Sequence, residues 1–188
     1  MNPAPNLVLV GPMGSGKSSI GRRLAERFDL VFFDADREIE AQAGASIATI
    51  FECAGEADFR AREQVVLAGL LTGEGTVIAT GGGAVADPRT RRLLQERGFV
   101  VHLHIDVRRQ LERLARDRTR PLLATDDREQ VLRRLAEARD PLYAEVADLR
   151  FDTGAMNVND TVARLGHLLE LHWQMAAAPV APAGSAAS

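Results

Sequence analysis

The sequence lacks two features: a pair of cysteines that could form a disulfide, and a long apolar run that could cross a membrane. It contains one cysteine, Cys53, so no disulfide can form within the chain, and a reducing compartment is favoured. We expect Cys53 to be a small buried apolar residue rather than a reactive thiol. No run approaches the roughly 20 apolar residues that cross a bilayer, and residues 1–6 lack a basic segment followed by an apolar one. The sequence therefore predicts a cytoplasmic protein without a membrane contact.

An excess of one charge is also lacking. Lysine and arginine together number 23 against 26 acidic residues, a net charge of −3, which argues against a nucleic-acid partner. Lysine itself is almost absent, because 22 of the 23 basic residues are arginine and the single lysine is Lys17. The hydrophobic fraction of 46% is ample for a core, and 188 residues suit one compact domain.

Short apolar runs alternate with amphipathic segments through most of the chain. The runs predict strands at 7–10, 30–33, 76–80, 99–105 and 148–151. Helices are expected at 17–28, within 37–73 with breaks near Gly44 and Gly55 and a cap at Ser46, from Asp87-Pro88 to Gly98, and at 107–115, 126–138 and 161–173. The alternation predicts an α/β fold of three layers, a mostly parallel sheet between helices, in one domain over 1–175. Residues 176–188, rich in alanine and proline, are expected to be a disordered tail.

A phosphate-binding loop follows the first predicted strand. Residues 11–18 match G-x-x-x-x-G-K-[ST] at every fixed position, between a strand and a helix as the motif requires. The glycines let backbone N–H groups surround a phosphate, Lys17 supplies an ammonium for the β- and γ-phosphates, and Ser18 supplies a hydroxyl for Mg²⁺. The loop predicts an ATP or GTP site. A guanine-reading N-K-x-D is excluded, because the only lysine follows Gly16.

Two further loops follow predicted strands and would lie at the same edge of the sheet. If the extended backbone continues, Asp34 and Asp36 share a face, so one carboxylate could support Mg²⁺ while the other accepts a proton from an attacking hydroxyl. A helix cap beside a solvated acid is the plainer interpretation. Gly81, Gly82 and Gly83 would let the backbone approach a ligand, unless they form a flexible turn.

Arginines near these loops can bind anions. Arg60 and Arg139 could each fork a substrate carboxylate, although exposed arginines are usually solvated. We expect a helix to end at Arg139, because Pro141 follows it closely. Residues 113–120 hold four arginines and suggest a lid that brings a guanidinium to the transferred phosphoryl group. An exposed basic turn or a nucleic-acid patch are the alternatives for this segment.

The histidines and the tryptophan receive structural interpretations. His102 and His104 share one face of a strand, and without a third ligand a structural role is favoured over a metal site. His167 and His172 are expected at the surface. Trp173 is expected to pack on the last helix or to flank the tail.

The combination of motifs resembles the shikimate kinases. The matching segments lie in the family's order between about residues 7 and 172: Gly11–Ser18, Phe33–Asp36, Ile50-Phe51, Gly55–Arg60, Gly81–Val85, Arg120–Leu123 and Arg139–Tyr143. The resemblance implies a five-stranded parallel sheet of the P-loop, nucleoside-monophosphate-kinase type with strand order 2-3-1-4-5. It also implies ATP-dependent phosphorylation of the 3-hydroxyl of shikimate, a step of aromatic amino-acid biosynthesis.

Site residues carried over from this resemblance fall into four groups. Catalytic roles go to Lys17, Asp36 and Arg120. ATP would contact Gly14, Ser15, Gly16, Lys17, Ser18, Ser19, Arg113 and Arg120. Shikimate would contact Asp36, Phe51, Phe59, Arg60, Gly81, Gly82, Gly83 and Arg139, with Glu63 orienting Arg60. Mg²⁺ would be supported by Ser18 and Asp34.

The resemblance further implies a shikimate-binding helical part at about 34–62, a lid at about 113–126 and a monomer. Arg113 would lie near the adenine, where residues 152–156 lack an arginine found in some family members and would offer backbone contacts alone. Two other functions stay open on the residues themselves. One is a gluconate-type sugar-acid kinase, and the other is a non-catalytic nucleotide-binding module that presents 113–120 to a protein or RNA.

Overall fold

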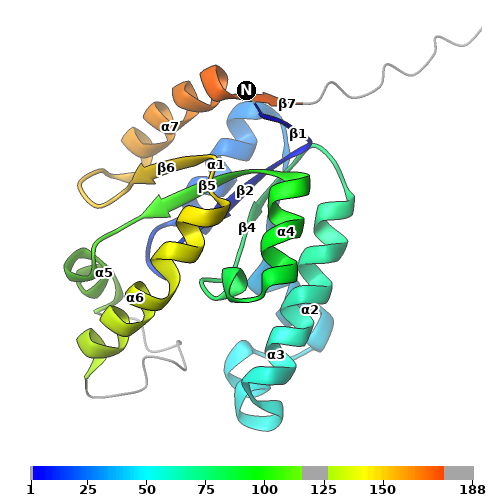
Figure 1. The fold of residues 1–188 in the computed structure, drawn as a ribbon, viewed down its shortest axis with the longest axis vertical. Helices are drawn as coiled ribbons and strands as arrows, with labels where there is room; N and C mark the ends of the chain where they lie inside the picture. Colours follow the sequence, from blue (N-terminus) through cyan, green and yellow to red (C-terminus); the bar gives the residue numbers. More distant parts are fainter. Residues whose placement is uncertain (1, 116–126, 176–188) are drawn as a thin grey trace, which may run out of the picture.

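Five parallel strands form the central sheet of the computed structural model, which describes residues 2–115 and 127–175 (Figure 1). In spatial order they are β3 (Val31–Asp34), β4 (Thr76–Ala79), β2 (Asn6–Val10), β5 (Gly98–His104) and β6 (Leu149–Asp152). Each neighbouring pair is parallel. Counted along the chain among these five strands, the order is 2-3-1-4-5, so the predicted topology is confirmed.

Alternate side chains of β2 pack against different helices, which is why the fold has three layers. Leu7 and Leu9 join the core beneath α1 (Lys17–Phe28) and α7 (Val158–His172). Val8 and Val10 join the core beneath α3 (Ile47–Thr72), α4 (Pro88–Arg97) and α6 (Arg128–Val146). A strand that is buried on both faces needs an unbroken apolar run, and every residue of β2 is buried.

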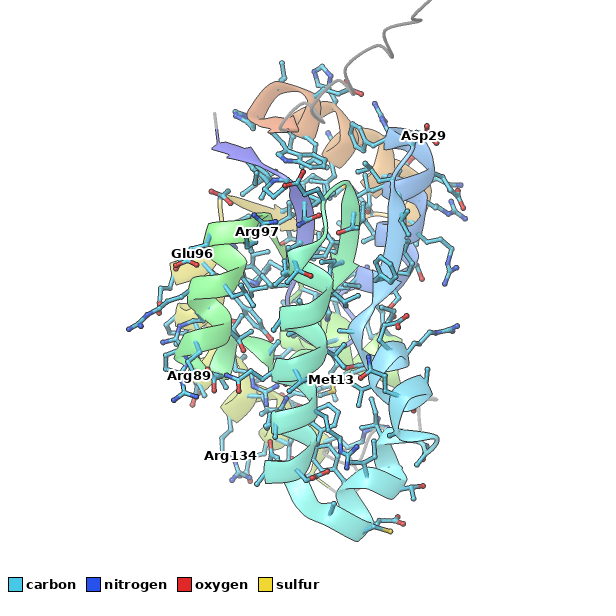
Figure 2. The ribbon with its side chains drawn as sticks, turned by 90° about the vertical axis from the view of Figure 1, so that its right-hand side faces the viewer. Met13, Asp29, Arg89, Glu96, Arg97 and Arg134 are labelled. Atoms are coloured by element: carbon cyan, nitrogen blue, oxygen red, sulfur yellow. The ribbon has the colours of Figure 1, made fainter. Side chains whose placement is uncertain are left out.

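The helix boundaries follow local signals in the sequence. Ser46 caps α3 by accepting a hydrogen bond of 3.1 Å from the N–H of Thr49, as predicted. The expected breaks are also present, because Gly44 and Gly55 have φ values of 63° and 81°. On α4, the exposed side chains of Arg89 and Glu96 lie on the outer surface (Figure 2). The remaining helical segments are α2 (Ala35–Ala43), the short η1 (Ala84–Ala86) and α5 (Val107–Leu114).

The helix α6 continues through Pro141, so the prediction that it ends at Arg139 was wrong. A proline inside a helix removes one backbone hydrogen bond and costs about 3 kcal/mol. Burial of the residues that follow offsets this cost. Tyr143 and Val146 are 1% and 3% exposed and pack in the core with Leu142, and each large apolar side chain buried stabilises by about 1.5–3 kcal/mol.

A second, smaller sheet joins the two ends of the described chain. In this terminal sheet β1 (Asn2–Ala4) pairs in parallel with β7 (Trp173–Met175). The sequence analysis placed Trp173 in the last helix, which was wrong, since that helix ends at His172. The expected packing on that helix is present, because the indole is buried in one core cluster with Leu165 and Leu169 of α7. It lies 6.0 Å from the ring of Phe28 and 6.3 Å from that of Phe99, and its Nε1 donates to the Ala4 carbonyl at 3.0 Å.

Two smaller expectations were tested by exposure. Cys53 is exposed, contrary to the prediction of a buried residue, because residues 52–54 form the last turn before the break at Gly55 and all three face solvent. His167 and His172 are exposed, as expected. Within the described ranges, no helix is long and apolar enough to cross a membrane.

Candidate active site

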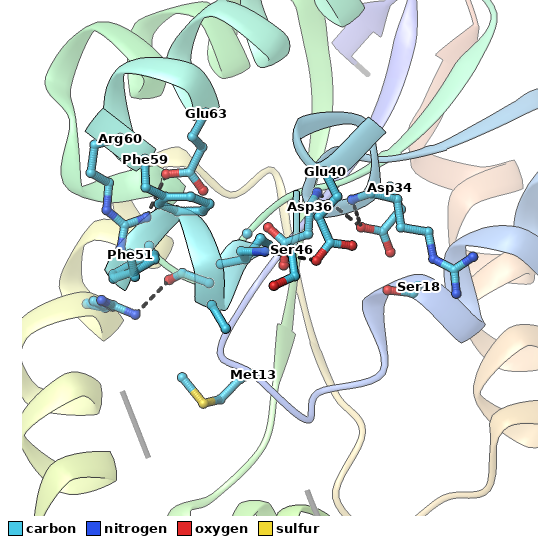
Figure 3. A pocket seen from close by; sticks show the side chains of 17 residues that line it. Met13, Ser18, Asp34, Asp36, Glu40, Ser46, Phe51, Phe59, Arg60 and Glu63 are labelled. Carbon is cyan, nitrogen blue, oxygen red and sulfur yellow. Dashed lines mark hydrogen bonds and ion pairs between the residues drawn. The ribbon is translucent and has the colours of Figure 1, made fainter. Parts of the chain in front are cut away.

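A cavity of about 630 Å³ opens at the carboxyl ends of β3 and β4 (Figure 3). Parallel α/β sheets bind ligands at this edge. The cavity is lined from several elements: by Met13 and Ser18 of the phosphate loop, by Asp34, Asp36, Arg37 and Glu40 at α2, by Ser46, Ile47, Ala48, Phe51, Phe59, Arg60 and Glu63 at α3, by Gly81, Gly82 and Gly83 after β4, and by Arg139 of α6. We call it the acceptor chamber.

A second cavity of about 220 Å³, the phosphate chamber, lies beside the first. It is lined by Gly14, Gly16, Lys17, Ser19 and Thr80, and it shares Met13, Ser18, Asp34, Asp36 and Gly82 with the acceptor chamber. The two carboxylates and Gly82 therefore stand where the chambers meet. A group bound in one chamber can reach a group bound in the other at this boundary.

The phosphate loop has the backbone that its glycines allow. Gly11, Gly14 and Gly16 have φ values of 143°, 77° and 94°, and a Cβ on Gly11 would overlap the Leu103 carbonyl oxygen. Gly16 precedes the first residue of α1, so the helix begins at the loop with its N–H groups directed toward the chamber. The Lys17 ammonium donates to the carbonyls of Gly11 and Pro12 at 2.8 and 2.9 Å.

Asp34 and Asp36 reach the boundary by a route that the sequence analysis did not predict. The extended backbone stops at Asp34, and α2 begins at Ala35. Asp34 caps this helix, since its Oδ1 accepts from the N–H groups of Asp36 at 3.1 Å and Arg37 at 3.4 Å. The plainer interpretation of Asp34 as a cap is therefore correct, and yet both carboxylates line both chambers.

Arg60 lines the acceptor chamber, beside Glu63 and Phe59 (Figure 3). Its guanidinium donates to Glu63 at 2.6 Å and to Glu56 at 3.0 Å, and it lies 5.1 Å above the ring of Phe59. The expected contact between Glu63 and Arg60 is thus present. The rings of Phe59 and Phe51 are 4.9 Å apart and form an apolar wall.

Glu63 is buried beside a second carboxylate. Burial raises the pKa of the Glu63 carboxyl, Arg60 opposes this, and the charge of Asp36 raises it further. Its Oε1 has no hydrogen-bond partner among the described residues. The chamber therefore contains two acidic groups of different environment on either side of Gly81.

Each glycine of the 81–83 run faces a different functional group. A Cβ on Gly81 would meet the Glu63 carboxylate and lie 2.9 Å from Asp36 Oδ1, whereas one on Gly83 would overlap the Arg60 guanidinium. A Cβ on Gly82 would lie 3.4 Å from the Met13 nitrogen, in ordinary contact with the phosphate loop. The run forms a turn, in which the Ala84 N–H donates to the Gly81 carbonyl at 3.2 Å, and this turn is packed against the site.

A comparison with known protein families agrees with this geometry. Residues 13–170 match the family model described as shikimate kinase. The chain belongs to the shikimate kinase family. Among proteins of this family, the shikimate kinase of Stenotrophomonas maltophilia (strain K279a) is 58% identical over 174 residues, which cover 93% of this chain and 97% of the relative.

Solved structures support the same fold. A shikimate kinase from Acinetobacter baumannii in complex with shikimate superposes with a TM-score of 0.87 and 46% identity, over 89% of this chain and 94% of that chain. A gluconokinase from Sinorhizobium meliloti superposes with a TM-score of 0.55 at 20% identity, over 90% of this chain and 98% of that chain. The second likeness concerns the fold alone.

Most residues that the family resemblance singled out come together. Ser18, Asp34, Asp36, Phe51, Phe59, Arg60, Gly81, Gly82, Gly83 and Arg139 all line the acceptor chamber. Arg113 instead bridges two loops, donating to the Gly14 carbonyl at 3.1 Å and to the Thr153 carbonyl at 2.5 Å. Three predictions fall outside the described residues: Arg120, the part of the expected lid from 116 to 126, and the tail at 176–188.

Several residues of the site were not predicted. Glu40 lines the acceptor chamber, and its position four residues after Asp36 could have indicated a shared helix face. Gln110 is buried and donates to the Met13 carbonyl at 2.9 Å, which ties α5 to the phosphate loop. Tyr143 donates to the Gly82 carbonyl. The last two contacts join residues far apart in the chain, so no local pattern could reveal them.

Proposed function

We propose that this protein transfers the γ-phosphoryl group of ATP to the 3-hydroxyl of shikimate, giving shikimate 3-phosphate and ADP. One observation carries the proposal: a phosphate chamber and an acceptor chamber meet at Asp36, and the guanidinium groups of Arg60 and Arg139 line the acceptor chamber. Membership of the shikimate kinase family and the likeness to a relative in complex with shikimate favour this acceptor.

In the acceptor chamber we assign shikimate to a position between its arginines and Asp36. Arg60 and Arg139 would hold its carboxylate, since guanidinium groups bind carboxylates bidentately. Phe51 and Phe59 would pack against its ring, and the backbone of 81–83 would contact its hydroxyls. Asp36 would accept the proton of the 3-hydroxyl while that oxygen bonds to phosphorus and the bond to the ADP oxygen breaks.

On the ATP side we assign the phosphates to the loop residues Gly14 to Ser19. Lys17 would turn from its loop carbonyls toward the β- and γ-phosphates. From the family resemblance we assign to Arg120 the neutralisation of charge on the transferred phosphoryl group, and to Arg113 a position near the adenine. Positioning and charge neutralisation together account for most catalysis in phosphoryl transfer.

The residues at the boundary fit a Mg²⁺ ion. The Ser18 hydroxyl and the Asp34 carboxylate line both chambers, and hydroxyl and carboxylate oxygens are ligands that Mg²⁺ prefers. Asp34 Oδ1 is the capping oxygen, so its Oδ2 is the oxygen we assign to the ion or to a water bound to it. When bound, the ion neutralises charge on the phosphate oxygens.

We also propose that the protein works as a monomer, as the family resemblance implies. Sedimentation of the active enzyme at assay concentration checks this, and a dimer as the smallest active species would contradict it.

The experiment that tests the proposed function is ADP release by the purified protein with Mg·ATP. Shikimate should stimulate ADP release by orders of magnitude over ATP alone, gluconate should not, and excess EDTA should abolish the stimulated rate. Stimulation by gluconate instead of shikimate would replace the assigned acceptor. ATP binding without stimulation by either acid would leave a nucleotide-binding module and overturn the proposal.

A further inference from the structure

The hydroxyl of Tyr143 connects the core of the protein to the glycine run. Tyr143 is 1% exposed, its ring stacks on that of His102 at 4.8 Å, and its hydroxyl donates to the Gly82 carbonyl at 2.5 Å. Ring and hydroxyl therefore have separate partners. The ring belongs to the packing beneath the sheet, and the hydroxyl is directed at the site.

The Gly82 carbonyl has a second donor from the same helix. Arg139 donates to it from Nη1 at 3.2 Å. Residues 139 and 143 are four apart on α6 and so share one face of the helix. The Gly82 carbonyl oxygen thus holds one nitrogen of the Arg139 guanidinium in place. This is a guanidinium to which we assign the carboxylate of the acceptor.

Gly82 is also the glycine at the boundary of the two chambers. It lines both of them, and a Cβ there would lie 3.4 Å from the Met13 nitrogen and 3.6 Å from the Gly11 carbonyl oxygen. A rotation of the peptide at Gly82 would therefore alter the acceptor chamber on one side and approach the phosphate loop on the other.

We propose that Tyr143 is a positioning residue for the acceptor: its hydroxyl fixes the Gly82 carbonyl, and through that carbonyl it sets the glycine run and the Arg139 guanidinium. Without the hydroxyl, Arg139 becomes the donor that must hold Gly82, and its guanidinium is drawn away from the acceptor. The inference rests on the proposed function and adds to it a residue that does not line the acceptor chamber.

The test is Tyr143→Phe, which removes the hydroxyl and keeps the ring on His102. We expect the KM for shikimate to rise about tenfold, the size expected for one buried hydrogen bond. The KM for ATP should change by less than about twofold, and kcat by less than about threefold, because Tyr143 lines neither the acceptor chamber nor the phosphate chamber.

Thr161→Val is the matched control. Thr161 is 1% exposed, and its hydroxyl donates to the Asn157 carbonyl at 2.8 Å in α7, away from both chambers. This variant also loses one buried hydroxyl that donates to a backbone carbonyl. Its melting temperature should fall about as much as that of Tyr143→Phe, while its KM for shikimate should equal that of the wild type.

A second measurement applies if Tyr143→Phe fails to fold. Tyr143 is the only tyrosine of the chain, so incorporation of 3-fluorotyrosine gives the wild-type sequence a single ¹⁹F resonance. Saturating shikimate, verified by calorimetry, should shift this resonance. A resonance that does not move would overturn the inference.

The outcomes separate this inference from the proposed function. An active wild type together with an unchanged shikimate KM in Tyr143→Phe would overturn the positioning role alone. Equal increases in both KM values, or the same increase in Thr161→Val, would reduce Tyr143 to a stabilising residue and also overturn it. A wild type without shikimate-dependent ADP release would overturn the proposed function and this inference with it.

Discussion

At the scale of single residues, Asp36 is the group that we propose as the general base for the acceptor hydroxyl. It lies in the first turn of α2, where the helix dipole stabilises a negative charge, and it faces both chambers. Glu63, on the other side of Gly81, is more deeply buried, and its pKa is raised by that burial. We therefore assign the proton acceptor to Asp36, which lines both chambers, rather than to Glu63, which lines the acceptor chamber but not the phosphate chamber.

Asp36→Asn should lower kcat by about 100- to 10,000-fold, because it removes the group that accepts the proton in the transition state. The Kd for ATP, measured by calorimetry, should stay within about threefold of the wild type. The control is Asp29→Asn, which makes the same chemical change at the end of α1 that is far from Met13 (Figure 2) and should keep the wild-type kcat. Asparagine tolerates the φ of 55° observed at this position. A wild-type kcat in Asp36→Asn would remove this residue from the mechanism.

At the scale of elements, the glycines 81–83 after β4 form a surface against which side chains from α3 and α6 pack. Arg60 lies against Gly83, Glu63 against Gly81, and Arg139 and Tyr143 bind the carbonyl of Gly82. A Cβ at Gly81 or Gly83 would displace the Glu63 carboxylate or the Arg60 guanidinium, which both line the acceptor chamber.

Gly83→Ala should raise the KM for shikimate about 10- to 100-fold, because the Cβ displaces the Arg60 guanidinium and a charged hydrogen bond to the acceptor is weakened. The KM for ATP should not change. Gly69→Ala is the control: Gly69 is an exposed position in α3 with open space around it. That variant should keep wild-type kinetics and gain about 0.5–1 kcal/mol in the free energy of unfolding. Wild-type shikimate KM in Gly83→Ala would show that Arg60 does not depend on this contact.

Elements that carry their own signals were predictable from the sequence. The central strands are continuous apolar runs, Ser46 and Asp87 are helix caps, and the phosphate loop is a spaced motif. The extension of α6 through Pro141 was not predictable, because it depends on burial of Tyr143 beneath strands far away in the chain. The start of α2 directly after Asp34 was missed for a related reason: an N-cap and an extended residue look alike until the next turn is known.

The same division applies to the site. The phosphate loop, the pair Asp34 and Asp36, and the glycines 81–83 could be predicted, because each follows a strand at the same edge of the sheet. Arg60 and Arg139 lie within helices, and their roles were given by the family resemblance. The contacts of Gln110 and Tyr143 with backbone carbonyls could not be predicted, since they span 97 and 61 residues and involve carbonyl groups that every sequence contains.

At the scale of the whole molecule, a buried histidine links stability to pH. His102 is 2% exposed on β5, and neither ring nitrogen has a hydrogen-bond partner among the described residues. Burial, together with the charges of His104, Arg150 and Lys17, lowers the pKa of His102 to about 4. The native protein therefore keeps this ring neutral where the unfolded chain would protonate it.

The free energy of unfolding should consequently fall as the pH drops from 6.5 toward 4. Between these pH values the unfolded chain binds a proton on His102 that the native state excludes. The stability that depends on a neutral His102 is therefore fully present above pH 6.5 and is lost near pH 4. Its size is on the order of 3 kcal/mol. His102→Phe should keep an aromatic ring against Tyr143 and lack this part of the acid sensitivity in urea titrations at pH 4.5 and 7. Equal losses in both proteins would mean that His102 does not control the acid response.

The terminal sheet has a consequence for how this protein can be observed. The only tryptophan is held in it, against the Ala4 carbonyl at the amino ends of the central strands, while both chambers open at the carboxyl ends. Intrinsic tryptophan emission should therefore report opening of the terminal sheet and stay unchanged when substrates bind. Removal of residues 1–4 should shift the tryptophan emission to longer wavelength and leave turnover unchanged. The emission would then measure whether the terminal sheet is formed.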